Sequence, residues 1–205
     1  MKKNLVTIDM DGTLFMQNSV LYLNEQMNLS DKKLREYHAK YSDGKLSEVE
    51  LNILQTPILR NVSLSRAYKV LISGPILKNI GLGVNLLRKS GNDVAMLTFN
   101  PFQGMFNEYF RIKCDVSMIV ELEEDRIGKV KHIPNNKITF LREYCSRNGI
   151  NLGDCIHIGD SQNDVPTFNE VGFSVALNSK DDNVATEASI SMNTEDFLEV
   201  VEALI

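Results

Sequence analysis

Two acidic side chains end the first apolar run of the chain. Asp9 and Asp11 stand two residues apart, directly after the uncharged run 5–8, and Gly12 follows them. Such a run is typical of a strand buried on both faces of a parallel sheet, and glycine allows a sharp turn after it. Ligands bind at the carboxyl ends of parallel strands, so the paired carboxylates predict a metal site or acid–base chemistry. Taken alone, the same residues also fit a solvated turn.

Two later apolar runs end in polar side chains in the same way. The run 155–158 leads into Asp160 and Asp164, and the run 94–97 leads into Thr98. In a parallel sheet the carboxyl ends of the strands share one edge. We therefore expect these side chains to converge with those that follow the first run.

The spacing of apolar residues, glycines, prolines and helix-capping residues predicts the remaining elements. We expect further strands at 116–120 and 173–176, a hairpin partner at 126–130, and helices at 76–90, 101–110, 134–147, 165–171 and 194–204. Strands that alternate with helices of this length predict an α/β fold built on a doubly wound parallel sheet.

The stretch between the first two core strands has a different texture. Strand-like runs are missing from residues 16–75, and apolar residues recur there at helical spacing, with breaks at Asp43-Gly44 and Pro57. We therefore predict a small α-helical cap domain at 16–75. It is inserted into an α/β core domain formed by residues 1–15 and 76–205.

The composition of the chain indicates which partners are disfavoured and where in the cell the protein is expected. The chain of 205 residues has a net charge of −5 and a pI near 5.3, which disfavours nucleic acid or an anionic membrane as its main partner. Its three cysteines lack the spacing of a metal site or a disulfide framework. No apolar run is long enough for a signal core or a membrane span. We expect a cytoplasmic protein.

Four motifs in order resemble those of the haloacid dehalogenase (HAD) superfamily of phosphatases, whose core is Rossmann-like. They are residues 9–14 (DMDGTL), Thr98, Lys137 and residues 159–164 (GDSQND). The resemblance covers essentially the whole chain. The most similar subgroup is the phosphoserine phosphatases, which carry a helical cap after the first motif; residues 44–46 and 149–152 also resemble that group.

The resemblance implies a role for each motif residue. Asp9 would be the nucleophile that forms an aspartyl-phosphate, and Asp11 the acid that protonates the leaving group and then activates water. Thr98 would donate a hydrogen bond to a phosphoryl oxygen, and Lys137 would neutralise charge on the transferred group. Alone, a threonine after a strand and a lysine near a helix start are more often structural.

The resemblance also implies a magnesium ion. Its ligands would be Asp9, Asp160 and the backbone carbonyl of Asp11, with Asp164 supporting them from behind. Two carboxylates about 4 Å apart repel by roughly 4 kcal/mol at an effective dielectric constant of 20, so crowded acids need a cation. A few oxygen ligands completed by phosphate and water suit the octahedral shell of Mg²⁺.

The substrate contacts depart from the subgroup. Asn163 and Asn100 would lie near the substrate, but Asn18 and Gln55 stand where the subgroup has a glutamate and an arginine. Two hydrogen bonds to charged groups are thereby lost, each worth about 1.5–3 kcal/mol. Arg60 or Arg66 could restore the positive charge, and His38 and His157 are expected to be packed or solvated rather than catalytic.

We therefore predict a magnesium-dependent phosphomonoesterase that acts on a small soluble phosphate ester. Three alternatives stay open at this point: a true phosphoserine phosphatase, a phosphotransferase, and a non-catalytic phosphate-binding protein that kept the fold.

Overall fold

A five-stranded parallel sheet forms the centre of the structure. The computed structural model describes residues 4–29, 31–117, 119–131 and 133–205. In spatial order the strands are β2 (Asn92–Met96), β1 (Asn4–Ile8), β5 (Cys155–Gly159), β6 (Phe173–Leu177) and β7 (Ile190–Met192). Every pairing is parallel. The predicted α/β fold with a doubly wound sheet is thereby confirmed.

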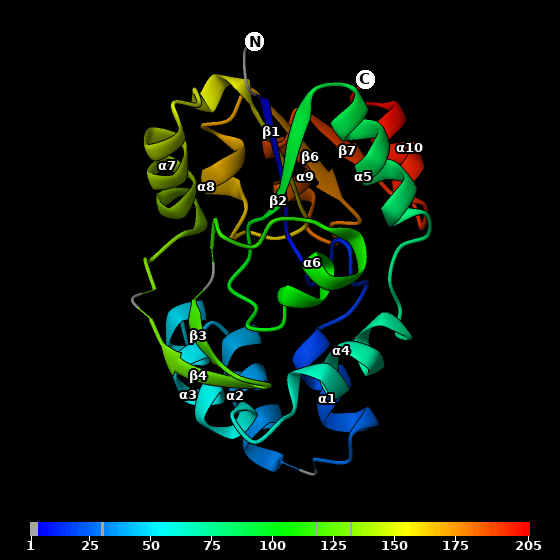
Figure 1. Cartoon of the computed structure of the whole chain (residues 1–205). Coiled ribbons are helices and arrows are strands. Elements are labelled where there is room, and N and C mark those ends of the chain that lie inside the picture. Colours follow the sequence, from blue (N-terminus) through cyan, green and yellow to red (C-terminus); the bar gives the residue numbers. More distant parts are fainter. Residues whose placement is uncertain (1–3, 30, 118, 132) are drawn as a thin grey trace.

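Helices flank the sheet on two sides. Figure 1 shows α7 and α8 on one side of the strands and α5 and α10 on the other. These four helices are α5 (Ile80–Lys89), α7 (Lys137–Asn148), α8 (Val165–Phe168) and α10 (Phe197–Glu202). The core also contains α9 (Asp182–Glu187) and a short 3₁₀ helix (Leu152–Asp154) before β5. Because helices cover both faces of the sheet, β1, β2, β5 and β6 are largely buried, whereas the short strand β7 is only partly buried.

A second group of elements lies beyond the carboxyl ends of the strands. We call it the helical layer: α1 (Ser19–Gln26), α2 (Lys32–Ser42), α3 (Glu48–Leu59), α4 (Leu64–Ile72) and the antiparallel hairpin β3 (Val120–Glu123) and β4 (Arg126–Val130). It occupies the lower half of Figure 1. The hairpin packs against α3, and Arg60 Nε donates to the Gly128 carbonyl at 2.9 Å. The division into a core and a cap domain stays a prediction.

Several element predictions were wrong in their bounds. The strand expected at 116–120 begins only at Val120, because the chain before it packs under the end of β2, where Ser117 Oγ accepts a hydrogen bond from the Thr98 N–H (residue 118 lies outside the described residues). Pro57 does not break α3 but lies in its last turn, where one missing N–H removes a single helical bond. The sequence reasoning also missed β7 and α9.

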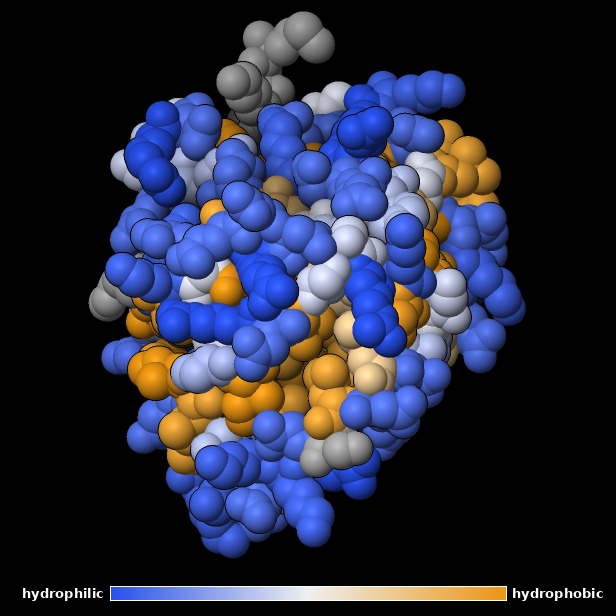
Figure 2. Space-filling view, turned by 60° about the horizontal axis from the view of Figure 1, so that its bottom comes forward, coloured by the Kyte–Doolittle hydropathy of each residue, from blue (hydrophilic) through white to orange (hydrophobic). Residues whose placement is uncertain are grey.

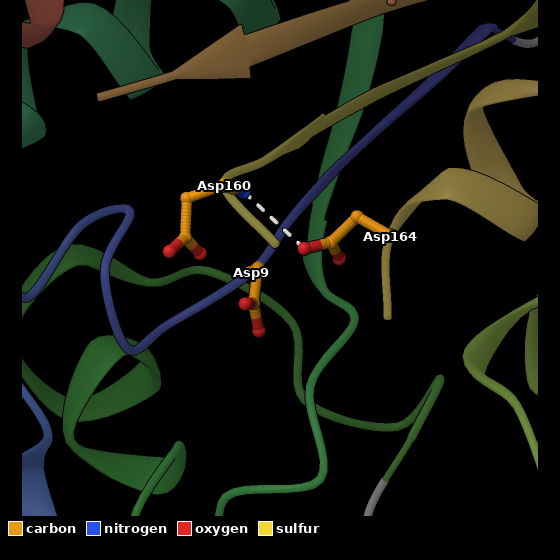
Figure 3. A group of neighbouring side chains, drawn as sticks. All are labelled: Asp9, Asp160 and Asp164. Atoms are coloured by element: carbon orange, nitrogen blue, oxygen red, sulfur yellow. Dashed lines mark hydrogen bonds between the residues drawn. The ribbon is translucent and has the colours of Figure 1, made fainter. Parts of the chain in front are cut away.

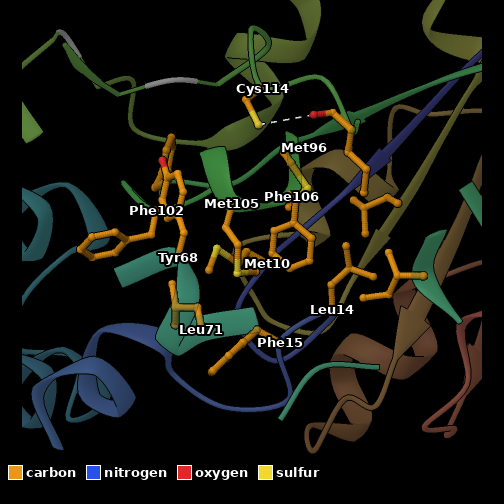
Figure 4. Packing of buried hydrophobic residues seen from close by; sticks show 14 of the residues in the cluster. Met10, Leu14, Phe15, Tyr68, Leu71, Met96, Phe102, Met105, Phe106 and Cys114 are labelled. Atoms are coloured by element: carbon orange, nitrogen blue, oxygen red, sulfur yellow. Dashed lines mark hydrogen bonds between the residues drawn. The ribbon is translucent and has the colours of Figure 1, made fainter. Parts of the chain in front are cut away.

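One hydrophobic cluster joins the sheet to the helical layer. Figure 4 shows Met10 and Leu14, from the loop after β1, together with Leu71 of α4 and Met105 of α6 (Gly104–Phe110). The hydroxyl of Tyr68 lies so close to Gly104 that an added Cβ there would be 2.3 Å from it. The helical layer is therefore anchored through α4 by close packing.

The outer surface of the helical layer is partly apolar. Figure 2, which brings the lower end of the molecule forward, shows hydrophobic side chains exposed among hydrophilic ones. Large exposed apolar residues of this layer include Ile53 and Leu54 of α3 and Leu122 of β3. In the part of the chain that the structure describes, no helix has both the length and the apolar character to cross a membrane.

Candidate active site

The predicted site residues surround one cavity of about 1050 Å³ between the sheet edge and the helical layer. Asp9, Thr98 and Asp160 follow the carboxyl ends of β1, β2 and β5, as the strand-end argument predicts. Their neighbours in the lining include the other residues that the sequence singled out: Asp11, Asn18, Gln55, Asn100, Lys137 and Asn163. Asp164 is fully buried behind them. Their roles stay predictions, but their convergence is a property of the fold.

The turn after β1 brings two distant acidic loops together. Gly12 has a φ of +82°, and a Cβ built on it would lie 2.0 Å from Asp160 Oδ2. The adjacent Thr13 hydroxyl donates to Asp160 Oδ1 at 3.1 Å. Only glycine combines this backbone conformation with room for the Asp160 carboxylate. Gly12 is therefore required for the approach of the two loops as well as for the turn.

Asp164 organises the loop that follows β5. Its Oδ2 accepts hydrogen bonds from the backbone N–H groups of Asp160 and Ser161 at 3.2 and 3.1 Å and from the Ser161 hydroxyl at 2.9 Å. Its Oδ1 lies 2.8 Å from Lys137 Nζ and 3.0 Å from His157 Nε2. Burial raises the pKa of Asp164, but Lys137 and the bond from His157 outweigh burial and lower the pKa below its usual value. Both oxygens are thus engaged by the protein.

His157 proves to be a buried connector. The sequence reasoning expected it to be packed or solvated, and it is fully buried within β5. Its Nδ1 lies 3.0 Å from the Thr7 hydroxyl of β1, while its Nε2 reaches Asp164. The imidazole therefore fixes the Asp164 carboxylate from the side away from the cavity.

Lys137 places a buried positive charge in the site. It is 2% exposed and is the first residue of α7, where Asn136 is the N-cap residue. Its Nζ lies 3.0 Å from Asp9 Oδ2 and 2.8 Å from Asp164 Oδ1. Although burial lowers the pKa of Lys137, the charges of these carboxylates raise it well above the usual value, so the amine stays charged.

Three carboxyl groups gather closely enough to hold a metal ion. One oxygen from each of Asp9, Asp160 and Asp164 lies within 4.8 Å of the others, at the ends of β1 and β5 (Figure 3). Because both oxygens of Asp164 are engaged, Asp9 and Asp160 are the ligands left to a cation. Burial raises the pKa of Asp9, although the charge of Lys137 lowers it in part. Burial and the charge of Asp9 together raise the pKa of Asp160 to about 8. Crowded oxygen donors that resist ionisation fit a divalent cation such as Mg²⁺.

Asp11 is suited to proton transfer. Its Oδ1 accepts the Ser19 backbone N–H at 3.1 Å, and its Oδ2 accepts Asn100 Nδ2 at 2.9 Å. Burial raises the pKa of Asp11 to about 7; hydrogen bonds from Ser19 lower the pKa, and the charge of Asp9 raises it. Asp11 can therefore hold or release a proton near neutral pH. Asn100 Nδ2 also donates to the Ser19 hydroxyl at 2.7 Å, and Asn100 lines the cavity; its substrate contact stays a prediction.

The helical layer lines the other side of the cavity with polar groups. Asn18 is the N-cap residue of α1, and the Gln55 side chain lies 3.0 Å from His38 Nε2 and donates to Asn52 at 2.9 Å. Neither arginine considered as a replacement cation lines the cavity: Arg60 binds the hairpin, and Arg66 is exposed on α4. That alternative is wrong.

The cavity lining also contains helical-layer residues to which the sequence analysis gives no role. Among them are Tyr41 and Glu48, while His38, which is expected to be packed or solvated, is buried and also lies in the lining. Asn163 Nδ2 donates to the Tyr41 hydroxyl at 2.5 Å, which ties α2 to the loop after β5. The capping box formed by Ser47 and Glu50 starts α3 and places Glu48 in its first turn. That capping pattern was the available signal, but it does not show which way Glu48 faces.

Comparisons with known proteins agree with this geometry. Residues 105–204 match a family model described as haloacid dehalogenase-like hydrolase. The curated phosphoserine phosphatase of Lactococcus lactis subsp. lactis (strain IL1403) is 22% identical, over 94% of this chain and 90% of that protein.

Solved structures resemble the whole chain. A phospho-aspartyl intermediate analogue of phosphoserine phosphatase has a TM-score of 0.74 at 18% identity and covers 99% of both chains. A phosphoserine phosphohydrolase-like protein from Francisella tularensis subsp. tularensis SCHU S4 has a TM-score of 0.73 at 15% identity and covers 100% of both chains. At such identities the likeness shows that the fold is shared.

Proposed function

We propose that this chain, which belongs to the haloacid dehalogenase-like hydrolases as its motifs predict, is a magnesium-dependent phosphomonoesterase acting on a small soluble phosphate ester. The observation that carries the proposal is the placement of Asp9, Lys137 and Asp160 around one cavity, with Asp11 beside them. This arrangement offers a nucleophile, a buried cation, a metal ligand and a proton donor in one place.

The first step would transfer the phosphoryl group to the protein. The carboxylate of Asp9 attacks phosphorus, the bond from phosphorus to the leaving oxygen breaks, and Asp11 gives its proton to that oxygen. Lys137 and the Thr98 hydroxyl would bind the phosphoryl oxygens as their charge develops. When bound by Asp9 and Asp160, Mg²⁺ supplies further positive charge for the phosphoryl oxygens.

The second step would restore the enzyme. Asp11, now ionised, takes a proton from a water molecule, whose oxygen attacks phosphorus and breaks the acyl-phosphate bond to Asp9. Inorganic phosphate leaves, and Asp11 again holds a proton. Asn100 and Ser19 keep the Asp11 carboxyl in one orientation through both steps.

The test is the hydrolysis of 4-nitrophenyl phosphate with and without Mg²⁺. We expect activity that EDTA abolishes, and a loss of at least about 10³-fold in kcat for Asp9→Asn, because the nucleophile is removed. Asp115→Asn is the matched control, since Asp115 is exposed and lies outside the cavity. Equal rates for Asp9→Asn and the control would contradict the proposal.

Phosphoserine phosphatase is the second candidate, favoured by the similar proteins of that name. It requires positive charge for the substrate carboxylate, and the helical layer contributes no lysine or arginine to the described cavity lining. The kcat/KM for phosphoserine relative to other phosphate esters decides between the two. We also infer a cytoplasmic location, because Cys114, Cys145 and Cys155 are free and buried.

A further inference from the structure

One acidic side chain of the cavity is not used by the proposed reaction. Glu48, in the first turn of α3, is an ionisable acid in the part of the lining that the helical layer contributes. Among the residues that the structure describes, its carboxyl group has no hydrogen-bond or ion-pair partner. A charged group that lines a site without a partner inside the protein is available to a ligand.

Burial and neighbouring charge make this carboxyl a poor anion without a partner. Burial raises the pKa of Glu48 to about 8; the charge of Lys137 lowers the pKa, and that of Asp9 raises it. Lys137 is itself held by Asp9 and Asp164, so its charge is shared with these closer carboxylates. A cation brought next to Glu48 would therefore find an unsatisfied acceptor.

The charge of the whole cavity also favours a positively charged ligand group. Six carboxyl groups line the described part of it: Asp9, Asp11, Glu48, Asp160, Asp181 and Glu195. Against them, Lys137 and Lys180 also line the cavity, and Lys78 lies 3.2 Å from Glu195, so three lysines face six carboxyl groups. One divalent cation would do no more than balance one phosphate dianion, so the cavity stays negative with both bound. A leaving group with a carboxylate would add to this excess, whereas an ammonium group would reduce it.

We propose that the leaving group of the substrate is an amino alcohol without a carboxylate, and that Glu48 binds its ammonium group. This inference rests on the proposed phosphomonoesterase function. The other groups on the same side of the cavity, among them Asn18 and Ser42, are uncharged and can take the remaining hydroxyl or ether atoms of such a substrate. Glu48 would act on specificity and not on the chemical steps, which belong to Asp9 and Asp11.

The experiment compares two phosphate esters of nearly equal shape. We expect kcat/KM for 2-aminoethyl phosphate to exceed that for 2-hydroxyethyl phosphate by about 10- to 100-fold, the usual worth of a hydrogen bond between charged groups. In Glu48→Gln this ratio should fall to within about threefold of one, because the amide keeps the shape but loses the charge. Glu36→Gln is the matched control, since it removes one negative charge from the exposed side of α2, and it should keep the wild-type ratio.

Binding of two phosphonates makes the outcome independent of turnover. Calorimetry with Mg²⁺ should show tighter binding of 3-aminopropylphosphonate than of 3-hydroxypropylphosphonate to the wild type, and equal binding to Glu48→Gln. A ratio near one in the wild type, a ratio unchanged in Glu48→Gln, or a higher kcat/KM for phosphoserine than for 2-aminoethyl phosphate would overturn the inference. Failure of the proposed function would appear separately, as hydrolysis of 4-nitrophenyl phosphate that does not depend on Asp9.

Discussion

Asp11 is the residue whose surroundings lead most directly to a measurable pH dependence. Burial raises its pKa to about 7, and the group must carry a proton to assist an alkoxide leaving group. We therefore expect kcat/KM for an alkyl phosphate to fall as the pH rises above about 7, by up to about tenfold per pH unit. The profile should be measured at a saturating Mg²⁺ concentration, so that metal binding does not limit the rate.

The leaving group provides the control for this pH profile. The 4-nitrophenolate ion leaves without a proton, so the decline at high pH should be weaker for 4-nitrophenyl phosphate. Asp11→Asn should lower kcat/KM for the alkyl ester by about 10²–10⁴-fold and for the aryl ester by less. Equal losses for both esters would mean that Asp11 does not act as the acid.

For individual residues, the sequence predicted which acidic side chains lie together at the sheet edge, but it did not predict every residue of the site. Asp9 and Asp160 could be placed together because both follow apolar runs, and parallel strand ends share an edge. Glu48 and Tyr41 could not be placed in the site from the sequence, because their position depends on how α2 and α3 pack over that edge. The hydrogen bond from Asn100 to Asp11 could not be predicted either, because residue type alone does not show which group a side chain contacts.

The turn that follows β1 can be tested with two glycines of the same backbone conformation. Gly12 and Gly91 have φ values of +82° and +90°, but only Gly12 leaves no room for a Cβ, which would lie 2.0 Å from Asp160. Each Gly→Ala change should cost about 1–2 kcal/mol for the left-handed conformation. Gly12→Ala should in addition displace Asp160 and abolish the effect of Mg²⁺ on activity.

Gly91→Ala is the matched control, since nothing lies within 4 Å of its added Cβ. It should lower the free energy of unfolding in urea and leave the response to Mg²⁺ intact. If Gly12→Ala keeps full activity with Mg²⁺, then the close approach of the two loops is not required for the site.

Elements were predictable where a local signal was strong. The run before Asp160 is apolar and ends in glycine, so β5 was placed almost to the residue. In contrast, β7 has three residues with Ser191 at its centre, too short and too polar to stand out. Pro57 predicts a break but lies inside α3, because a proline in the last turn of a helix removes one hydrogen bond and does not prevent the helix.

The whole molecule should be more stable when a divalent cation is present. Asp9 and Asp160 repel each other across the site, and a ligand that binds only the folded state stabilises it by mass action. At a Mg²⁺ concentration 100 times the Kd, the gain is about 2.7 kcal/mol, or roughly 5–10 °C in Tm for a chain of this size. Thermal unfolding with Mg²⁺ and with EDTA measures the gain.

Asp160→Asn is the variant that separates specific binding from a general salt effect. It should lose most of the rise in Tm, while Asp115→Asn, which removes an exposed charge of the same kind, should keep it. The same rise in Tm for all three proteins would place the cation elsewhere.

The covalent state of the protein during turnover tests the central claim most directly. Asp11→Asn should slow the release of phosphate from Asp9 more than its transfer from an aryl ester, so the phosphorylated protein should accumulate. After 4-nitrophenyl phosphate and Mg²⁺ are mixed with Asp11→Asn and quenched in acid, mass spectrometry should find one phosphoryl group on the peptide that contains Asp9. It should be absent when Mg²⁺ is replaced by EDTA. Hydrolysis without any labelled peptide, or a label on another residue, would contradict the account.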